Sequence, residues 1–252
     1  RPRGYRGAAA RPQLTRRRAA PPPLTTMRLD LAERLRCPAT THAPTPLVVV
    51  ARSVVARDLR EGIAGCPLCS LEARFQEGHL VFGASASPAA HPIEVSLAET
   101  RSVPLAERDQ EPSADAAAVE RLVALLGLAE PGGAVLLTPG YAALADALAA
   151  TADVDVVVYD TAGVARTEFA RAVRGLASAV PFTDGTFRAA ALDVASAEFT
   201  ADAVRAVAPR GRVLCAVELD APAGVTILAR DAREWVGERG ALPGPVVTLG
   251  RR

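Results

Sequence analysis

Residues 134–160 read AVLLTPGYAALADALAATADVDVVVYD. Two short apolar runs, Ala134–Leu137 and Val154–Tyr159, flank a segment rich in Ala and Leu over Tyr141–Ala150. Short apolar runs that alternate with helical segments are typical of βαβ units, whose parallel strands are buried on both faces. The stretch therefore predicts strand, helix and strand, and with them a parallel sheet.

The same alternation continues on both sides of this stretch. Apolar residues at helical spacing predict helices over Val119–Leu128, Thr200–Val207 and Ala232–Glu238. The further strands are predicted within Phe169–Val180 and at Thr186–Asp193, Arg212–Glu218, Val225–Ala229 and Val246–Leu249. Residues 117–252 therefore predict an α/β domain with a Rossmann-like, seven-stranded, mostly parallel sheet.

Composition sets limits on the size of the fold and on its partners. The chain has 252 residues, of which 50% are hydrophobic, and this is enough for one core plus a small module. All 29 basic residues are arginine, and seven of them lie in residues 1–26, which hold no acid. The remainder carries 22 basic and 28 acidic residues, a net charge of −6. This balance argues against a broad nucleic-acid-binding face.

Residues 1–26 are interpreted as a disordered, arginine-rich tail. They lack the apolar region of a secretory signal. Met27 is the only methionine, and we expect it to be the true start; a basic RNA-binding arm is the alternative reading of the tail. No apolar run reaches the ~18–20 residues that a membrane span needs, and a cytoplasmic protein is expected.

Residues 27–83 contain a cysteine and histidine pattern typical of zinc sites. Cys66 and Cys69 form a C-x2-C pair, and Cys37 and His42 lie upstream of it. Two such turns can hold one tetrahedral Zn2+, and a site closed by four protein ligands is structural. The pattern predicts a small zinc-ribbon-like β module, with residues 84–116 as a linker to the α/β domain. Metal binding would contribute on the order of 10 kcal/mol to its stability.

Alternatives to this metal assignment remain open. The module could be a metal-free ribbon or carry a simple dithiol at Cys66 and Cys69. His79 is a weaker candidate ligand than His42 and is expected to pack or to cap a turn. Cys215 lies within an apolar run and is expected to be a core thiol.

The N-terminal module resembles a known family over about fifty residues. The segments that carry the resemblance are Leu31–Pro38, Glu61–Cys69 and Phe75–Leu80. They look like the small zinc-ribbon proteins that activate tRNA and protein methyltransferases. The chain departs from that pattern at Thr40, where the family has a second cysteine.

The C-terminal region resembles class I S-adenosylmethionine-dependent methyltransferases. Ala179–Ala190 is similar to the family segment that leads into strand four, and Ala203–Leu214 is similar to the helix and turn before strand five. The resemblance implies S-adenosylmethionine as cofactor. These two segments serve turns and packing, so they support the fold more than the activity.

The cofactor loop is where the chain departs from that family. Members have an acidic residue and a G-x-G-x-G loop after strand one, whereas here Leu137-Thr138-Pro139-Gly140 keeps one glycine. Pro139 has no N–H to donate, and Thr-Pro-Gly-Tyr favours a tight turn. Asp160 matches the acidic residue that members of this family use to hold the ribose hydroxyls. Alternatively, it is a simple aspartate at a strand end or a helix N-cap. The candidate cofactor-binding residues are Gly140, Asp160 and Asp184, of which Asp184 is also a candidate turn cap.

Two functions follow from these patterns. The first is a methyltransferase-like pseudo-enzyme with a degenerate S-adenosylmethionine loop, acting as a binding or scaffold module for a protein or RNA through its ribbon. The second is an active S-adenosylmethionine-dependent methyltransferase whose acceptor, an RNA or a small molecule, is unknown. A Rossmann domain of other chemistry is a weaker third, because no G-x-G-x-x-G or P-loop motif is present.

Overall fold

The computed structural model describes residues 27–76, 79–82, 114–160, 171–174 and 179–241. The helices are α1 (Leu29–Ala32), α2 (Ala114–Leu126), η1 (Pro139–Leu144), α3 (Ala145–Ala152), η2 (Val194–Phe199) and α4 (Thr200–Ala206), η1 and η2 being 3₁₀ helices. The strands of the N-terminal part are β1 (Met27–Arg28), β2 (Val48–Val55), β3 (Asp58–Gly65), β4 (Glu72–Gln76) and β5 (His79–Phe82). Those of the C-terminal part are β6 (Ala134–Leu137), β7 (Asp155–Asp160), β8 (Arg171–Arg174), β9 (Phe187–Leu192), β10 (Val207–Ala216), β11 (Val225–Arg230) and β12 (Glu234–Arg239).

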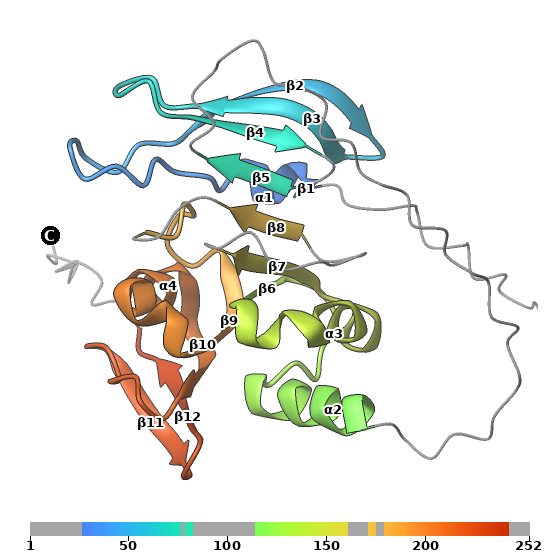
Figure 1. The fold of residues 1–252 in the computed structure, drawn as a ribbon, viewed down its shortest axis with the longest axis vertical. Helices are drawn as coiled ribbons and strands as arrows, with labels where there is room; N and C mark the ends of the chain where they lie inside the picture. Colours follow the sequence, from blue (N-terminus) through green and yellow to red (C-terminus); the bar gives the residue numbers. More distant parts are fainter. Residues whose placement is uncertain (1–26, 77–78, 83–113, 161–170, 175–178, 242–252) are drawn as a thin grey trace, which may run out of the picture.

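The C-terminal strands are arranged as in a doubly wound sheet. Their spatial order is β8-β7-β6-β9-β10-β12-β11, and β8, β7, β6, β9 and β10 are parallel. Counted along the chain, the five parallel strands have the order 3-2-1-4-5 of the Rossmann fold, with the reversal between β6 and β9. The strands β12 and β11 add an antiparallel hairpin at one edge (Figure 1). The predicted α/β class is confirmed.

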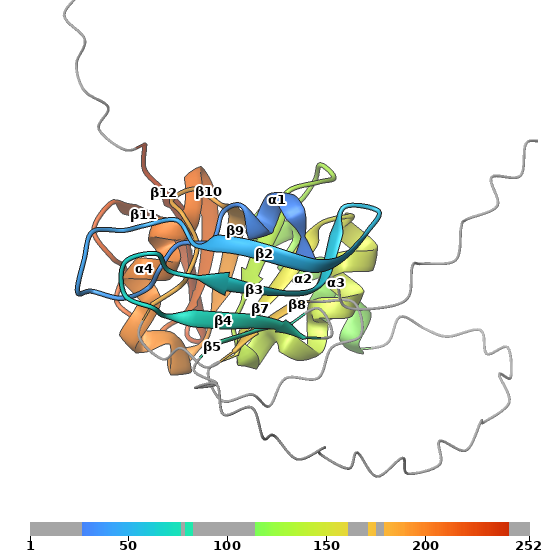
Figure 2. The ribbon, with the colours of Figure 1, turned by 90° about the horizontal axis from the view of Figure 1, so that it is seen from above.

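The N-terminal strands extend this same sheet. They pair antiparallel with one another, and β5 then pairs parallel with β8, with Leu80 opposite Val173. One mixed, twelve-stranded sheet therefore runs through the described residues, from the blue strands to the red ones in Figure 1. Seen from above, the antiparallel strands lie over the parallel ones (Figure 2). The ribbon-like module and the α/β part thus share backbone hydrogen bonds.

Helices cover both faces of the parallel strands. On one face α2 and α3 pack Leu122, Leu126 and Leu148 against alternate strand residues such as Leu137. On the other face Leu136 belongs to a second core, which includes α4 and the N-terminal strands. The alternation of Leu136 and Leu137 between two cores is the period-2 pattern of a strand buried on both sides.

Some predicted elements differ in the structure. Ala232–Glu238, predicted as a helix, was wrong: the segment forms β12, which pairs with β10 on one side and β11 on the other. Gly237 suits this place, because a Cβ there would lie 2.6 Å from Val225 Cγ1. The predicted helix Tyr141–Ala150 begins as the 3₁₀ helix η1 and becomes α-helical at Ala145. The predicted strand Val246–Leu249, the tail 1–26 and most of the linker lie outside the described residues.

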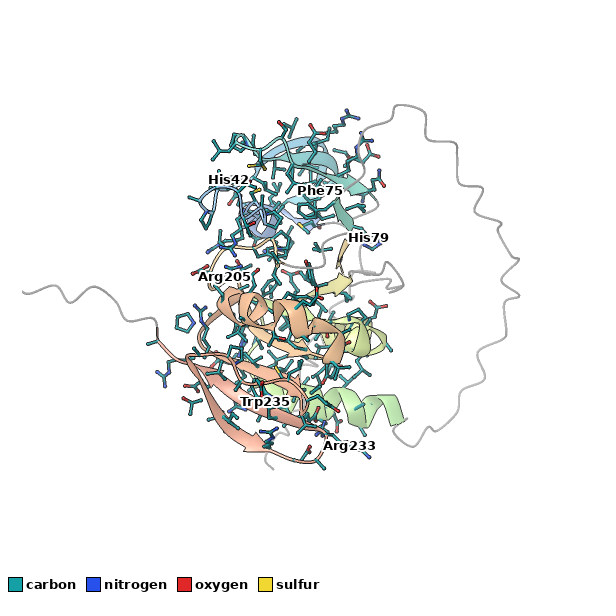
Figure 3. All side chains as sticks on the ribbon, turned by 60° about the vertical axis from the view of Figure 1, so that its left-hand side comes forward. His42, Phe75, His79, Arg205, Arg233 and Trp235 are labelled. Carbon is teal, nitrogen blue, oxygen red and sulfur yellow. The ribbon has the colours of Figure 1, made fainter. Side chains whose placement is uncertain are left out.

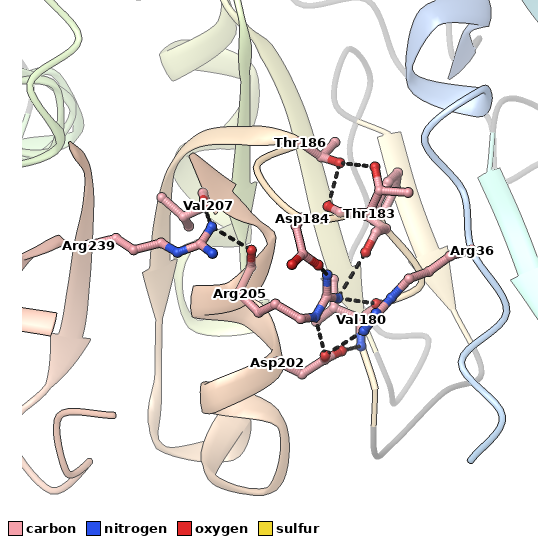
Figure 4. A network of polar contacts seen from close by, with 10 residues as sticks. Arg36, Val180, Thr183, Asp184, Thr186, Asp202, Arg205, Val207 and Arg239 are labelled. Atoms are coloured by element: carbon pink, nitrogen blue, oxygen red, sulfur yellow. Dashed lines mark hydrogen bonds and ion pairs between the residues drawn. The ribbon is translucent and has the colours of Figure 1, made fainter. Parts of the chain in front are cut away.

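A polar network joins the N-terminal module to α4 (Figure 4). Arg36 donates to the Asp202 carboxylate at 2.8 Å, and Arg205 donates to the same oxygen at 2.6 Å. The second Asp202 oxygen accepts the N–H of Val180 at 2.6 Å. Next to it, Leu35 and Phe182 form an isolated β-bridge. The chain directly before Cys37 is therefore fixed to the segment that leads into β9.

Within the described ranges, no helix is both long enough and apolar enough to cross a membrane.

Candidate functional site

The four predicted metal ligands come together in the structure. The sulfur atoms of Cys37, Cys66 and Cys69 and a ring nitrogen of His42 all lie within 4.8 Å of one another. Cys37 Sγ lies 3.5 Å from Cys69 Sγ, and Cys66 Sγ lies 3.4 Å from His42 Nε2. Three thiolates and one imidazole at these separations suit a tetrahedral Zn2+ with bonds of about 2.0–2.3 Å. The donor set therefore fits the expected metal.

Local structure prepares each ligand for this role. Cys66 follows β3, and its sulfur accepts the N–H of Leu68 at 3.4 Å, so the C-x2-C turn directs an amide at the sulfur. His42 Nδ1 lies 2.7 Å from the Ala43 carbonyl. A proton on Nδ1 donated to that carbonyl leaves the Nε2 lone pair free for a metal, the usual arrangement around a zinc-bound histidine.

Burial disfavours the charged thiolate form of one of these cysteines. Cys37 is 3% exposed, and its burial raises the pKa of its thiol to about 12. A thiol of this kind stays protonated at neutral pH unless a cation replaces the proton, and zinc binding does so. His42 and Phe75 are labelled in the upper part of Figure 3, which shows the N-terminal strands that carry the cluster. The candidate ligand His79 begins β5 and is outside the cluster.

The loop after β6 is closed against the end of β9. Gly140 donates its N–H to Asp193 Oδ2 at 2.5 Å. The Thr138 hydroxyl donates to the Ala191 carbonyl at 3.3 Å and accepts the N–H of Asp193 at 2.8 Å. Asp193 also accepts the N–H of Ala195 and so caps η2. These bonds cross the point where the strand order reverses, the place where open α/β sheets bind their ligands.

The three candidate cofactor residues do not meet at one place. Gly140 lies after β6 and Asp160 is the last residue of β7, so both are at the carboxyl edge of the parallel strands. Asp184 lies in the turn before β9, at the opposite edge, where its carboxylate accepts a hydrogen bond of 2.5 Å from Arg205. The side chain of Asp160 lies outside the described part of the structure.

The structure adds residues at the carboxyl edge that the sequence did not suggest. Glu234 begins β12 opposite Ala216, the last residue of β10. Its carboxylate accepts a hydrogen bond of 3.5 Å from the Tyr141 hydroxyl and forms an ion pair with Arg121 of α2. Burial, followed by the negative charge of Glu234, raises the pKa of Tyr141 above its usual range. Glu234 was missed because its segment has a helical pattern of apolar residues.

No protein-family model matches the chain, and no curated protein sequence matches it. Several solved structures resemble parts of it, and three of them are described as methyltransferases. A candidate methyltransferase from Bacillus halodurans has 23% identity over 40% of this chain and 53% of its own, with a TM-score of 0.32. A candidate sarcosine dimethylglycine methyltransferase from Galdieria sulphuraria has 15% identity over 39% and 44%, with a TM-score of 0.34. The antibiotic-resistance methyltransferase Kmr has 17% identity over 49% and 93%, with a TM-score of 0.34.

The matched part of the chain thus spans about half the length of the first two of these proteins. The assignment of a doubly wound, methyltransferase-like fold rests on the strand order of the molecule itself.

Proposed function

We propose that this chain is a methyltransferase-like binding module whose S-adenosylmethionine site has been replaced by internal hydrogen bonds. The observation that carries the proposal is the bond from the Gly140 N–H to the Asp193 carboxylate across the reversal point of the sheet. A cofactor held at such a loop needs backbone N–H groups that are free to face it.

None of the four positions 138–141 offers such a group. The N–H of Thr138 is donated to the Ala191 carbonyl, and that of Tyr141 to the Thr138 carbonyl. Pro139 has no N–H, and Gly140 donates to Asp193. A ligand would have to break hydrogen bonds inside the protein before it formed any with this loop. The free energy lost with the internal bonds is about as large as the free energy gained with the new ones.

The Cys3His cluster is proposed as a structural zinc site. Cys37, His42, Cys66 and Cys69 would hold the ion, which supplies no reactive position when all four ligands are protein groups. It would tie the loop at His42 to the end of β3. Since Arg36 and Leu35 contact the segment before β9, the metal would also stabilise the junction between the two parts of the sheet.

A protein is favoured over RNA as the partner of the N-terminal module. Among the described strands, the edge strand β2 pairs with β3 alone, and it exposes apolar side chains and one arginine, Arg52. Its exposed valines are Val48, Val50, Val54 and Val55. An uncovered edge with apolar side chains is the kind of surface that accepts a strand from another protein, whereas RNA binding calls for basic and stacking groups.

The alternative function is an active S-adenosylmethionine-dependent methyltransferase with an RNA or small-molecule acceptor. Two features favour it: Asp160 at the end of β7, and the Tyr141–Glu234 pair at the same edge of the sheet. In that case Asp160 would accept hydrogen bonds from the ribose hydroxyls, and the Tyr141–Glu234 pair would lie beside the methyl acceptor.

Calorimetric titration with S-adenosylmethionine separates the two functions. We expect no binding heat at millimolar ligand for the wild-type chain. Micromolar binding that Asp160→Asn weakens tenfold or more would overturn the pseudo-enzyme proposal. Glu130→Gln is the matched control, because Glu130 is an exposed acid in the turn before β6, at the amino edge of the sheet.

A further inference from the structure

The amino edge of the parallel strands contains a cavity of about 530 Å³. It lies between the end of α2, the starts of β6 and β9, and the turn within β10 at Ala208–Gly211. Its volume suits a ligand of nucleotide size. The cavity is at the opposite edge from the closed loop at Gly140, so it is independent of the function proposed above.

The charge of this cavity contrasts with that of the rest of the protein. Arg188, Arg210 and Arg212 line it together with one acid, Glu238. Residues 27–252 carry a net charge of −6, yet the lining carries a net charge of +2. Among the described residues, none of these three arginines forms an ion pair with a carboxylate. Their positive charge is therefore not neutralised within the cavity.

Two of the arginines are held in place by backbone carbonyl groups. Arg188 donates to the carbonyls of Glu130 at 2.5 Å and Gly127 at 3.2 Å. Arg212 donates to the carbonyl of Ala124 at 3.3 Å, near the end of α2. Carbonyl partners fix a guanidinium group without cancelling its charge, and this lowers the entropy cost of binding an anion.

The Arg210 side chain, unlike those of Arg188 and Arg212, forms no hydrogen bond or ion pair with the described residues. Arg210 is exposed and has a φ of +65°, a left-handed conformation that costs free energy in a residue with a side chain. The next residue must be small, because a Cβ on Gly211 would lie 2.5 Å from the Arg188 carbonyl oxygen. The turn thus packs closely on β9 and presents Arg210 at the rim of the cavity.

Apolar lining completes the site. Ala208 and Pro209 line the cavity beside the arginines. A ligand with an anionic group and a flat, less polar part would contact both kinds of surface. A smaller neighbouring cavity of about 190 Å³ shares Gly133 and Thr186 with it. Its lining contains two arginines, Arg28 and Arg34, and two acids, Asp30 and Asp155, and so has no excess charge. The positive region is therefore compact, and this favours a small ligand over an extended nucleic acid.

We propose that the amino-edge cavity binds a small phosphorylated molecule of mononucleotide size, with its phosphate among Arg188, Arg210 and Arg212. Guanidinium groups bind phosphate oxygens through paired, charge-assisted hydrogen bonds. Arg210 is the residue that contributes charge to the cavity without contributing a hydrogen bond to the fold.

The test compares two glycine variants by calorimetry at physiological ionic strength, with adenosine 5′-monophosphate and inorganic pyrophosphate as probes. Arg210→Gly removes one of the three positive charges of the cavity and relieves the left-handed strain, so its urea midpoint should not fall. Arg57→Gly is the matched control: Arg57 is an exposed arginine with a φ of +70° in the turn between β2 and β3, outside the cavity lining. Like Arg210→Gly, Arg57→Gly removes one positive charge and relieves a left-handed backbone conformation.

We expect both probes to bind the wild type and Arg57→Gly alike, and Arg210→Gly about tenfold or more weakly. Absence of binding heat at millimolar probe would overturn the proposal, and so would equal weakening by the two variants. A six-nucleotide RNA that binds more tightly than the mononucleotide, with the same dependence on Arg210, would overturn the small-molecule assignment in favour of nucleic acid.

Discussion

Asp193 and Gly140 are joined by a hydrogen bond of 2.5 Å from the Gly140 N–H to the Asp193 carboxylate, although they follow different strands, β9 and β6. The two strands are neighbours in the sheet, and the chain reverses its spatial order between them. A ligand at this point would lie between the two loops, in the space that the hydrogen bond between Gly140 and Asp193 spans. Two predictions test how firmly this contact is built.

Replacing Gly140 with alanine should destabilise the protein by about 1–3 kcal/mol. A Cβ at this position would lie 2.6 Å from Asp193 Oδ2 and 2.9 Å from Asp193 Cβ, so the two loops would have to separate. Urea unfolding measures the effect. Gly65→Ala is the control, because its added Cβ meets no atom within 4 Å. Equal stability of the two variants would mean that the loops are not in contact.

Replacing Asp193 with alanine should cost about 1–2 kcal/mol in the same measurement. The change leaves the N–H groups of Gly140 and Ala195 without their acceptor. Asp193→Asn keeps one acceptor oxygen and should lose less. Glu198→Ala, an exposed acid on η2, should change the stability by less than about 0.5 kcal/mol. A similar loss in Glu198→Ala and Asp193→Ala would refute the capping role.

The sequence predicted this loop better than it predicted the sheet around it. Pro139 and the missing glycines are local features that predicted a tight turn, and the chain forms the 3₁₀ helix η1 there instead of a type II turn, since Gly140 has no positive φ. The loss of the cofactor cradle stays a prediction. The partner of that turn, Asp193, lies on another strand, and nothing in its own segment identifies Gly140 as its donor. Contacts between strands depend on the order of the sheet, which residue patterns do not encode directly.

Two further features were outside the reach of pattern reading. The apolar residues of Ala232–Glu238 are spaced as in a helix, yet pairing with β10 and β11 makes the segment a strand, because tertiary context outweighs a short local pattern. The N-terminal module was predicted as a unit beside the α/β domain. Its join to the main sheet depends on a single parallel pairing between β5 and β8. In contrast, spacing alone predicted which four residues form the Cys3His cluster.

Asp202 should be a strong determinant of the junction between the two parts of the sheet. Asp202→Ala would leave Arg36, whose side chain is 16% exposed, without its carboxylate partner, whereas Arg205 would keep its bond to Asp184. A fully buried charge that loses its partner costs about 3–5 kcal/mol. We expect a loss of about 2–4 kcal/mol here, because water reaches part of the side chain. Urea unfolding followed by the fluorescence of Trp235 would report the loss.

The control for Asp202 is Asp30, whose carboxylate pairs with Arg28 at 3.0 Å on the surface. Both side chains of that pair are about half exposed, so Asp30→Ala should cost about 0–1 kcal/mol. A loss for Asp202→Ala no larger than that for Asp30→Ala would mean that the network in Figure 4 does not stabilise the junction.

Removal of zinc should expose three of the four cysteines to alkylation and leave the fourth protected. Cys37, Cys66 and Cys69 belong to the proposed metal site, whereas Cys215 lies within β10 and is completely buried. Chelation should leave the burial of Cys215 in the sheet unchanged, and this burial raises the pKa of its thiol to about 12. The similar pKa of Cys37 depends on its burial beside the other ligands, and we expect that burial to be lost when the metal no longer holds the loop.

Iodoacetamide labelling followed by mass spectrometry should therefore give no adduct on the zinc-loaded protein, three after treatment with a chelator, and four after unfolding in urea. Cys215→Ser should remove the fourth adduct and leave the other three unchanged, which assigns them to the cluster. Labelling of Cys37, Cys66 and Cys69 at the same rate before and after chelation, in protein with less than half an equivalent of zinc per chain, would refute the metal site. Labelling of Cys215 together with the other three would instead mean that zinc stabilises the whole sheet. Cys37, Cys66 and Cys215 belong to one hydrophobic core, so the loss of metal would then disturb the packing of that core as far as β10.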